Sequence, residues 1–144
     1  MTVSAAVINK CTVTAGAMPF GNYDTFSATN LDVSANIDVA CTKNTAPAIT
    51  MNVGLNAASA VRRMKGARAT PDFLNYEVYL PASNAANAAC AYTTVWNATP
   101  AGTLTLTAAP NKVLRTYKAC GRILAGQDVG VDSDSDTIVV TVTF

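Results

Sequence analysis

The basic residues of the chain gather in one short run that could hold a phosphate group. The run RRMKGAR at 62–68 contains four of the ten basic side chains, which are Arg62, Arg63, Lys65 and Arg68. A nucleic-acid site would interleave such residues with aromatic side chains on which bases stack, and this run contains none. We therefore interpret it as a solvent-exposed stretch between two strands.

Acidic residues alternate near the end of the chain in a pattern that resembles the start of a calcium-binding loop. They are Asp128, Asp132, Asp134 and Asp136, and carboxylate oxygens at such spacing suit Ca²⁺. An EF-hand counted from Asp132 would need glycine where Thr137 stands and a bidentate glutamate where Thr143 stands. The pattern favours a charged turn ahead of the last strand, and we expect no metal site.

The chain offers few groups for acid–base or nucleophilic catalysis. It contains no histidine, which is the commonest general base, and Glu77 is its single glutamate. It has no G-x-S-x-G nucleophile motif, no phosphate-binding P-loop and no dinucleotide fingerprint. We expect neither enzymatic activity nor a cofactor.

The four cysteines stand far apart, with no C-x-x-C pair among them. They are Cys11, Cys41, Cys90 and Cys120. Structural zinc sites need short cysteine spacings or imidazoles, so disulfides are the better interpretation, and they imply an oxidising compartment. Three pairings are open. We favour Cys11 with Cys41 and Cys90 with Cys120, each of which would contribute about 3 to 4 kcal/mol in the chain-entropy model.

The composition indicates a single all-β domain. Half of the 144 residues are hydrophobic and only 13% are charged, and Ala, Thr, Val and Asn replace the Glu, Lys and Leu of a helical protein. The formal net charge of +1 predicts no nucleic-acid partner and no anionic membrane surface. No run approaches the roughly 18 consecutive apolar residues of a membrane span, and residues 1–15 lack the regions of a signal peptide. We expect a mature chain that is not inserted in a membrane.

Alternating hydrophobicity predicts a series of short strands. The clearest lies at 31–41, where every second residue from Leu31 to Cys41 is apolar. Others are expected at 48–55, 73–80, 90–96, 103–107 and 113–123. Residues 56–72 are expected to form a loop or a poorly defined strand, and 113–123 have no clean phase that tells whether Tyr117 or Cys120 faces inward. About eight or nine strands without a helix or a linker predict a β-sandwich.

The last strand lacks the features that normally protect a sheet edge. In SDSDTIVVTVTF at 133–144, the side chains of Ile138, Val140, Val142 and Phe144 share one face. The segment is β-branched and carries no charge after Asp136, whereas exposed edges are usually interrupted by proline, lysine or a bulge. A partner strand beside it is therefore expected.

Short motifs follow one another along the whole chain. They are an alternating segment with Val3, Ala5 and Val7 four residues ahead of Cys11, PFGNY at 19–23, IDVAC at 37–41, NYEVYL at 75–80, the lone Trp96, GRILAGQDV at 121–129 and the terminal DTIVVTVTF. In this order they resemble the spore coat protein U domain, the subunit family of archaic chaperone–usher pili. That family usually has tyrosine where Cys120 stands, which suggests an extra disulfide with Cys90, and an aromatic residue where Met1 stands.

The resemblance implies an incomplete immunoglobulin-like β-sandwich. Residues 10–144 would form a domain that lacks its last strand, with an acceptor groove along Ile138, Val140, Val142 and Phe144. Residues 1–9 would be a donor-strand extension, and Met1, Val3, Ala5 and Val7 would enter the groove of a neighbouring subunit. The alternation of large and small or polar residues over 1–8 agrees with a strand.

The function that the resemblance implies is structural. The chain would be a pilin of a pilus rod, periplasmic during assembly and finally at the cell surface. Its partners would be further copies of itself, a periplasmic chaperone and an outer-membrane usher. A tip adhesin would carry a second, receptor-binding domain, for which this chain has no room. The alternative is a self-contained β-sandwich, a spore-coat or surface-binding protein whose N-terminal strand folds back onto its own last strand.

Overall fold

The regular structure of the chain consists of strands alone. The computed structural model describes all residues, 1–144. The larger sheet contains β1 (Cys11–Ala15), β2 (Leu31–Cys41), β8 (Arg115–Ile123), β5 (Phe73–Pro81), β4 (Arg62–Gly66), β9 (Asp134–Ser135) and β6 (Cys90–Val95). The smaller sheet contains β10 (Val140–Thr143), β3 (Ala48–Met51) and β7 (Leu104–Thr105). None of the elements is a helix that could cross a bilayer.

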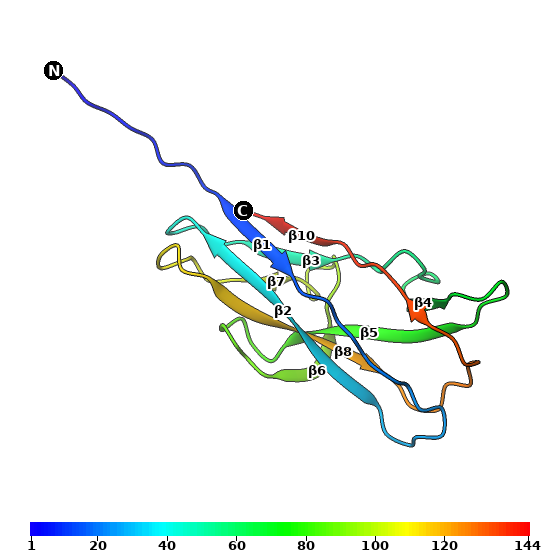
Figure 1. Cartoon of the computed structure of the whole chain (residues 1–144). Coiled ribbons are helices and arrows are strands. Elements are labelled where there is room, and N and C mark those ends of the chain that lie inside the picture. The colour runs from blue at the N-terminus through cyan, green and yellow to red at the C-terminus, as the bar shows by residue number, and fades with distance from the viewer.

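The two sheets form a sandwich, and β1 and β10 are edge strands of the larger and the smaller sheet (Figure 1). The larger sheet has the order β1-β2-β8-β5-β4-β9, with β6 paired to β5, and the smaller has the order β10-β3-β7. All pairings are antiparallel. β1 pairs only with β2, and β10 pairs only with β3. The predicted all-β, immunoglobulin-like sandwich is confirmed, and β1 and β10 each have one unpaired side.

Strands β2 and β8 form the centre of the larger sheet. β2 pairs with β8 over nine positions from Leu31↔Ile123 to Val39↔Arg115, and its residues Ile37 and Val39 are almost completely buried. Both faces of β8 are covered, because Tyr117 packs into the core while Cys120 is buried in a disulfide to β6. A strand covered on both faces shows no alternation, so the sequence around 113–123 had no clean phase.

The single tryptophan joins the two sheets. Trp96 follows β6 and is fully buried in the core cluster. Its backbone N–H donates to the carbonyl of Val78 on β5, and its indole Nε1–H donates to the carbonyl of Ile49 on β3 at 3.0 Å. Because a buried indole N–H needs an acceptor, this bond fixes how the smaller sheet sits on the larger one.

The segment 56–72, expected to be a loop or a poorly defined strand, contains one short strand. Residues 62–66 form β4, which pairs with β5 and β9, and Arg62 is buried with only 1% of its surface exposed. The prediction of a solvent-exposed basic stretch is therefore wrong for Arg62. The pattern was unreadable because β4 buries a charged residue at one position and a glycine at another, so it has no apolar alternation.

The two disulfides have the pairing that the sequence favoured. Cys11 is bonded to Cys41, which is also its partner in the β1–β2 register, and Cys90 is bonded to Cys120. The first disulfide ties the beginning of β1 to the end of β2. Residues 1–10 therefore leave the domain from a fixed point.

Candidate functional site

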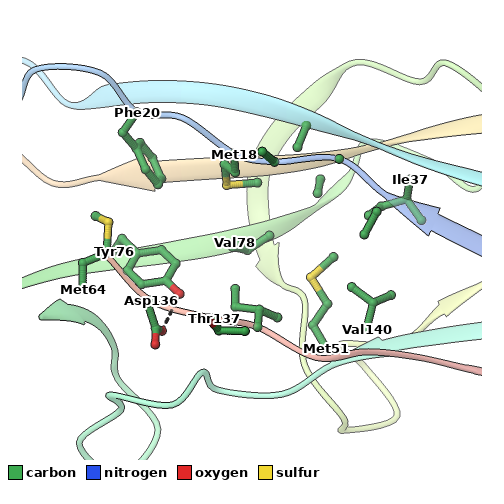
Figure 2. A pocket seen from close by; sticks show the side chains of 16 residues that line it. Met18, Phe20, Ile37, Met51, Met64, Tyr76, Val78, Asp136, Thr137 and Val140 are labelled. Carbon is green, nitrogen blue, oxygen red and sulfur yellow. Dashed lines mark hydrogen bonds between the residues drawn. The ribbon is translucent and has the colours of Figure 1, made fainter. Parts of the chain in front are cut away.

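The site that the fold positions best is an apolar groove between the unpaired sides of β1 and β10. A cavity of about 280 Å³ lies between residues 15–20, which continue β1, and residues 136–140, which lead into β10 (Figure 2). Thirteen of the sixteen residues that line it are hydrophobic. The lining residues are Ala15, Gly16, Ala17, Met18, Phe20, Ala35, Ile37, Met51, Met64, Tyr76, Val78, Ala119, Asp136, Thr137, Ile138 and Val140.

The backbone on both sides of the groove has unused hydrogen-bonding capacity. After Gly16 donates to Asn36, residues 17–23 make no backbone–backbone hydrogen bond. On the opposite side, the carbonyls of Thr137 and Val139 accept from residues 52–55, whereas Ile138 makes no backbone–backbone bond. Adjacent residues of a strand direct their backbone groups to opposite sides, so the free groups of Ile138 face away from β3 and toward the groove. An extended segment could pair with both sides.

The floor of the groove comes from the larger sheet. Val78 and Tyr76 of β5 lie across it, and the Phe20 ring packs edge-on against Tyr76 with ring centroids 6.0 Å apart. The Tyr76 hydroxyl donates to Asp136 Oδ2 at 2.7 Å, which is the dashed line in Figure 2. Burial, this hydrogen bond and the nearby carboxylate charge raise the pKa of Tyr76 above its usual value. The hydroxyl therefore stays protonated, and its hydrogen bond joins Tyr76 in the floor of the groove to Asp136 in the wall.

Asp136 also fixes the wall that leads into β10. Its Oδ1 accepts from the backbone N–H groups of Leu55 and Asn56 and from Asn56 Nδ2. Close by, Asn52 pairs with Val139, since Asn52 N–H donates to the Val139 carbonyl and Val139 N–H donates to Asn52 Oδ1. The acidic residues expected in a charged turn thus include one that builds the groove.

Buried Arg62 stabilises the loop after β3, which is hydrogen-bonded to this wall. Its guanidinium donates to the carbonyls of Asn52 at 2.6 Å and Trp96 at 2.7 Å, and it forms an ion pair with Glu77. The single glutamate, which could have served as an acid or base, is thereby occupied in a structural pair. The loop after β3 is held by Arg62 on one side and holds Val139 on the other.

A second hollow lies next to the groove, beside Met18 and Phe20. This hollow has a volume of about 700 Å³ and lies between residues 18–26 and residues 129–134. It shares Met18, Phe20 and Met64 with the first cavity, so the two hollows are neighbours. Its far end is polar, with Asp24, Asp132 and Asp134 in the lining. No cluster of three or more His, Cys, Asp or Glu side chains is arranged to hold a metal ion.

The residues expected along the groove divide into two groups. Ile138 and Val140 line the cavity, and Val142 packs against the core without lining it. Phe144 is 56% exposed and lies outside it. Sequence reasoning did not assign Met18, Phe20 or Tyr76 to the site, although the motifs PFGNY and NYEVYL contain two of them, because only the fold brings these distant segments together.

The N-terminal segment lies away from the groove. Residues 1–10 are exposed and extended, and Figure 1 shows them projecting beyond the start of β1. Met1, Val3 and Val7 are among the most exposed apolar side chains of the chain. Only residues 8–10 are hydrogen-bonded to the domain. Thr42 donates to the carbonyls of Ile8 and Lys10, and the Thr45 hydroxyl donates to Asn9 Oδ1. The chain therefore carries an unpaired apolar segment and an unfilled apolar groove at different places.

Comparisons with known proteins point to one family. The family model of the Spore Coat Protein U domain matches residues 1–141. Among solved structures, the fold is similar to a chain in the crystal structure of the CsuC–CsuE chaperone–tip adhesion subunit pre-assembly complex from archaic chaperone–usher Csu pili of Acinetobacter baumannii. The TM-score is 0.65 at 18% identity, and the match covers 96% of this chain and 40% of that chain. No curated protein matches.

Proposed function

The chain belongs to the spore coat protein U domain family, and on this basis we propose that it is a pilin of a chaperone–usher pilus rod that polymerises by donor-strand complementation. The observation that carries the proposal is the apolar groove open between β1 and β10 in a chain whose own alternating segment is unpaired. Residues 1–9 are the donor segment, and residues 10–144 are the acceptor domain. Its assembly partners are a periplasmic chaperone and an outer-membrane usher, and the finished filament is extracellular.

The mechanism requires burial and backbone pairing and no chemical step. Met1, Val3 and Val7 of one copy enter the groove of the next, and each large side chain that becomes buried contributes roughly 1.5 to 3 kcal/mol. The free N–H and C=O groups beside the groove pair with the donor backbone, which fixes its direction and register. Ala5 would mark a shallow part of the groove, since a single methyl group needs little depth.

The geometry of donor and acceptor leads to a filament. The donor segment and the groove are different surfaces of one copy, so the contact between copies is heterologous. A heterologous contact whose rotation does not close extends without limit. Each added copy fills one groove and presents another.

A self-contained sandwich is the competing function. It requires residues 1–9 to turn back at Lys10 and fill the groove of the same copy. The exposed and extended state of this segment favours transfer between copies instead. Size-exclusion chromatography and electron microscopy separate the two, since a self-contained protein would give monodisperse monomers and a pilin would give ladders or filaments.

Two neighbouring alanines provide the test of the donor segment. Ala5→Lys would place a charge in an apolar groove, where burial of an unpaired charge is very costly, so we expect assembly to be lost. Ala6→Lys is the matched control, because Ala6 points to the opposite face of the donor strand, and we expect it to assemble. Deletion of residues 1–8 should likewise abolish polymers and leave a subunit that its chaperone still stabilises. Polymers formed by the deletion variant would overturn the proposed function.

A further inference from the structure

Three lysines surround the point at which the donor segment leaves the domain. Lys10, Lys43 and Lys112 are exposed and line a shallow hollow beside the Cys11–Cys41 disulfide. No aspartate or glutamate occurs within residues 8–13, 40–46 or 107–114, which form this end of the molecule. We call these three lysines the basic end. None of them forms an ion pair with an acidic side chain of the same copy.

Five aspartates gather at the opposite end of the sandwich. This acidic end consists of Asp24, Asp72, Asp132 and Asp134, with Asp128 directly before Val129 in the lining of the second hollow. Two basic residues lie among them, since Arg68 is beside Asp132 and Lys65 pairs with Ser135 on β9, so five negative charges outnumber two positive ones. Burial and the carboxylates of Asp132 and Asp72 raise the pKa of Asp134, so these groups lie within electrostatic reach of one another. The ion pairs of the chain are Arg62–Glu77 and Arg122–Asp32, and neither involves the acidic end.

The two charged ends are separated by the length of β2. This strand runs from Leu31, beside the acidic end, to Cys41 at the basic end, and eleven residues in a strand span about 35 Å. The second hollow, which borders the groove at Met18, Phe20 and Met64, lies at the acidic end, because Asp24, Asp132 and Asp134 line it. Nine donor residues span about 30 Å, so a bound donor segment would extend along most of the groove.

We propose that successive copies also dock through these ends, with the lysines of the donor copy against the aspartates of the acceptor copy. The inference rests on the proposed function, because Lys10 directly follows the donor segment and must emerge at one end of the occupied groove. In Figure 1, β10 runs toward the start of β1, which directly follows Lys10. A donor antiparallel to β10 therefore brings Lys10 to the acidic end of the acceptor, whereas a parallel donor would bring lysines against lysines.

Charge complementarity of this kind acts mainly on the rate of encounter. Opposite charges on two docking surfaces raise association rates by about 10- to 1,000-fold at low salt, and the gain is lost as salt screens it. Because the donor segment itself carries no charged side chain, the two ends supply the steering that the apolar groove lacks.

The test is a charge reversal at each end of the full-length chain. Lys43→Glu/Lys112→Glu and Asp128→Lys/Asp134→Lys change residues whose side chains make no hydrogen bond or ion pair in the folded domain. We expect each double variant to polymerise at least about tenfold more slowly than the unaltered chain at low salt, and at a similar rate near 0.5 M salt, where the Debye length is about 4 Å. The chain that carries all four changes should polymerise again at about the unaltered rate, since the charges of both ends are then reversed and attract each other once more.

Control variants and outcomes separate this inference from the proposed function. Lys118→Glu makes the same change of charge as Lys112→Glu, but Lys118 lies on the outer face of β8 and bonds Asn36, so we expect it to leave the rate unchanged. If both double variants assemble at the unaltered rate through residues 1–9, the docking of charged ends is wrong and the donor mechanism stands. If assembly continues without residues 1–8, the donor mechanism itself is wrong.

Discussion

Arg62 shows how a single residue can have a role opposite to the one its neighbours suggest. It stands in a basic run whose other members are half-buried or exposed, yet its guanidinium is buried against Glu77 and the carbonyls of Asn52 and Trp96. Composition and spacing could not reveal this, because the pairing depends on the register of β4 against β5. The one available signal was that Glu77 is the single glutamate and needs a partner if its strand is buried.

Replacement of Arg62 tests its structural role. Arg62→Met keeps most of the side-chain volume but leaves Glu77 and two carbonyls without their donor. We expect the free energy of unfolding to fall by about 3 to 5 kcal/mol, as happens when one partner of a buried pair is removed. Arg68→Met is the matched control, because the Arg68 side chain is exposed, and it should cost less than about 0.5 kcal/mol. Urea unfolding with both disulfides intact measures the difference, and equal losses for the two variants would contradict the role assigned to Arg62.

At the scale of elements, the sequence was most informative where a strand buries one face. The alternation from Leu31 to Cys41 predicted β2 with its observed bounds. The strand expected at 48–55 ends earlier, at Met51, and the one expected at 138–144 is shortened to 140–143. β1 was missed because CTVTA is too short to show a pattern. β4 was left open between a loop and a poorly defined strand, because a buried arginine breaks its alternation.

The groove could be predicted only in part for the same reason. Its edge along Ile138 and Val140 follows from the alternation of the last strand. Its other wall, with Met18 and Phe20, follows no periodic pattern, because residues 17–23 belong to no strand and make no backbone–backbone hydrogen bond. Local pattern therefore predicts one wall, and the second wall becomes visible only when the sheets are assembled.

Two adjacent residues of the wall provide a test at this scale. Ile138 lines the cavity, whereas Val139 is 51% exposed on the other face. Ile138→Lys should prevent polymers from forming, since a charge would stand where donor side chains must be buried. Val139→Lys should assemble normally. Because Ile138 also packs against the core, circular dichroism and thermal unfolding of each chaperone-bound variant must show a folded subunit, and polymers of folded Ile138→Lys would rule out this wall as the acceptor.

At the scale of the whole molecule, the N-terminal segment and the groove lie apart within one copy. The disulfide at Cys11 fixes where residues 1–10 leave the domain, and they project away from the sheets (Figure 1). The chain thus has an unpaired apolar segment at one end and an apolar groove along its side. In the mechanism that we propose, transfer between copies would satisfy both, and each transfer would leave one of each free for the next copy.

A rearranged chain tests both the completion of the fold and the direction of the donor. Residues 1–9 are removed from the front and attached after Phe144 through a hairpin linker of about four residues, a length typical of β-hairpin loops. If the donor runs antiparallel to β10, this short linker suffices, and we expect a monodisperse monomer that does not polymerise. Its thermal unfolding midpoint should exceed that of the chain lacking residues 1–9, because at least two large side chains become buried, each contributing roughly 1.5 to 3 kcal/mol.

Linker length then distinguishes the two directions. A donor parallel to β10 would have to start at the far end of the groove, and a linker must cross about 30 Å to reach it, which takes at least about nine residues. We therefore compare linkers of about four and about twelve residues by size-exclusion chromatography and calorimetry. Stabilisation with both linkers supports the antiparallel donor and the docking of opposite charges. Stabilisation with the long linker alone would reverse the direction, and it would bring the basic ends of successive copies together.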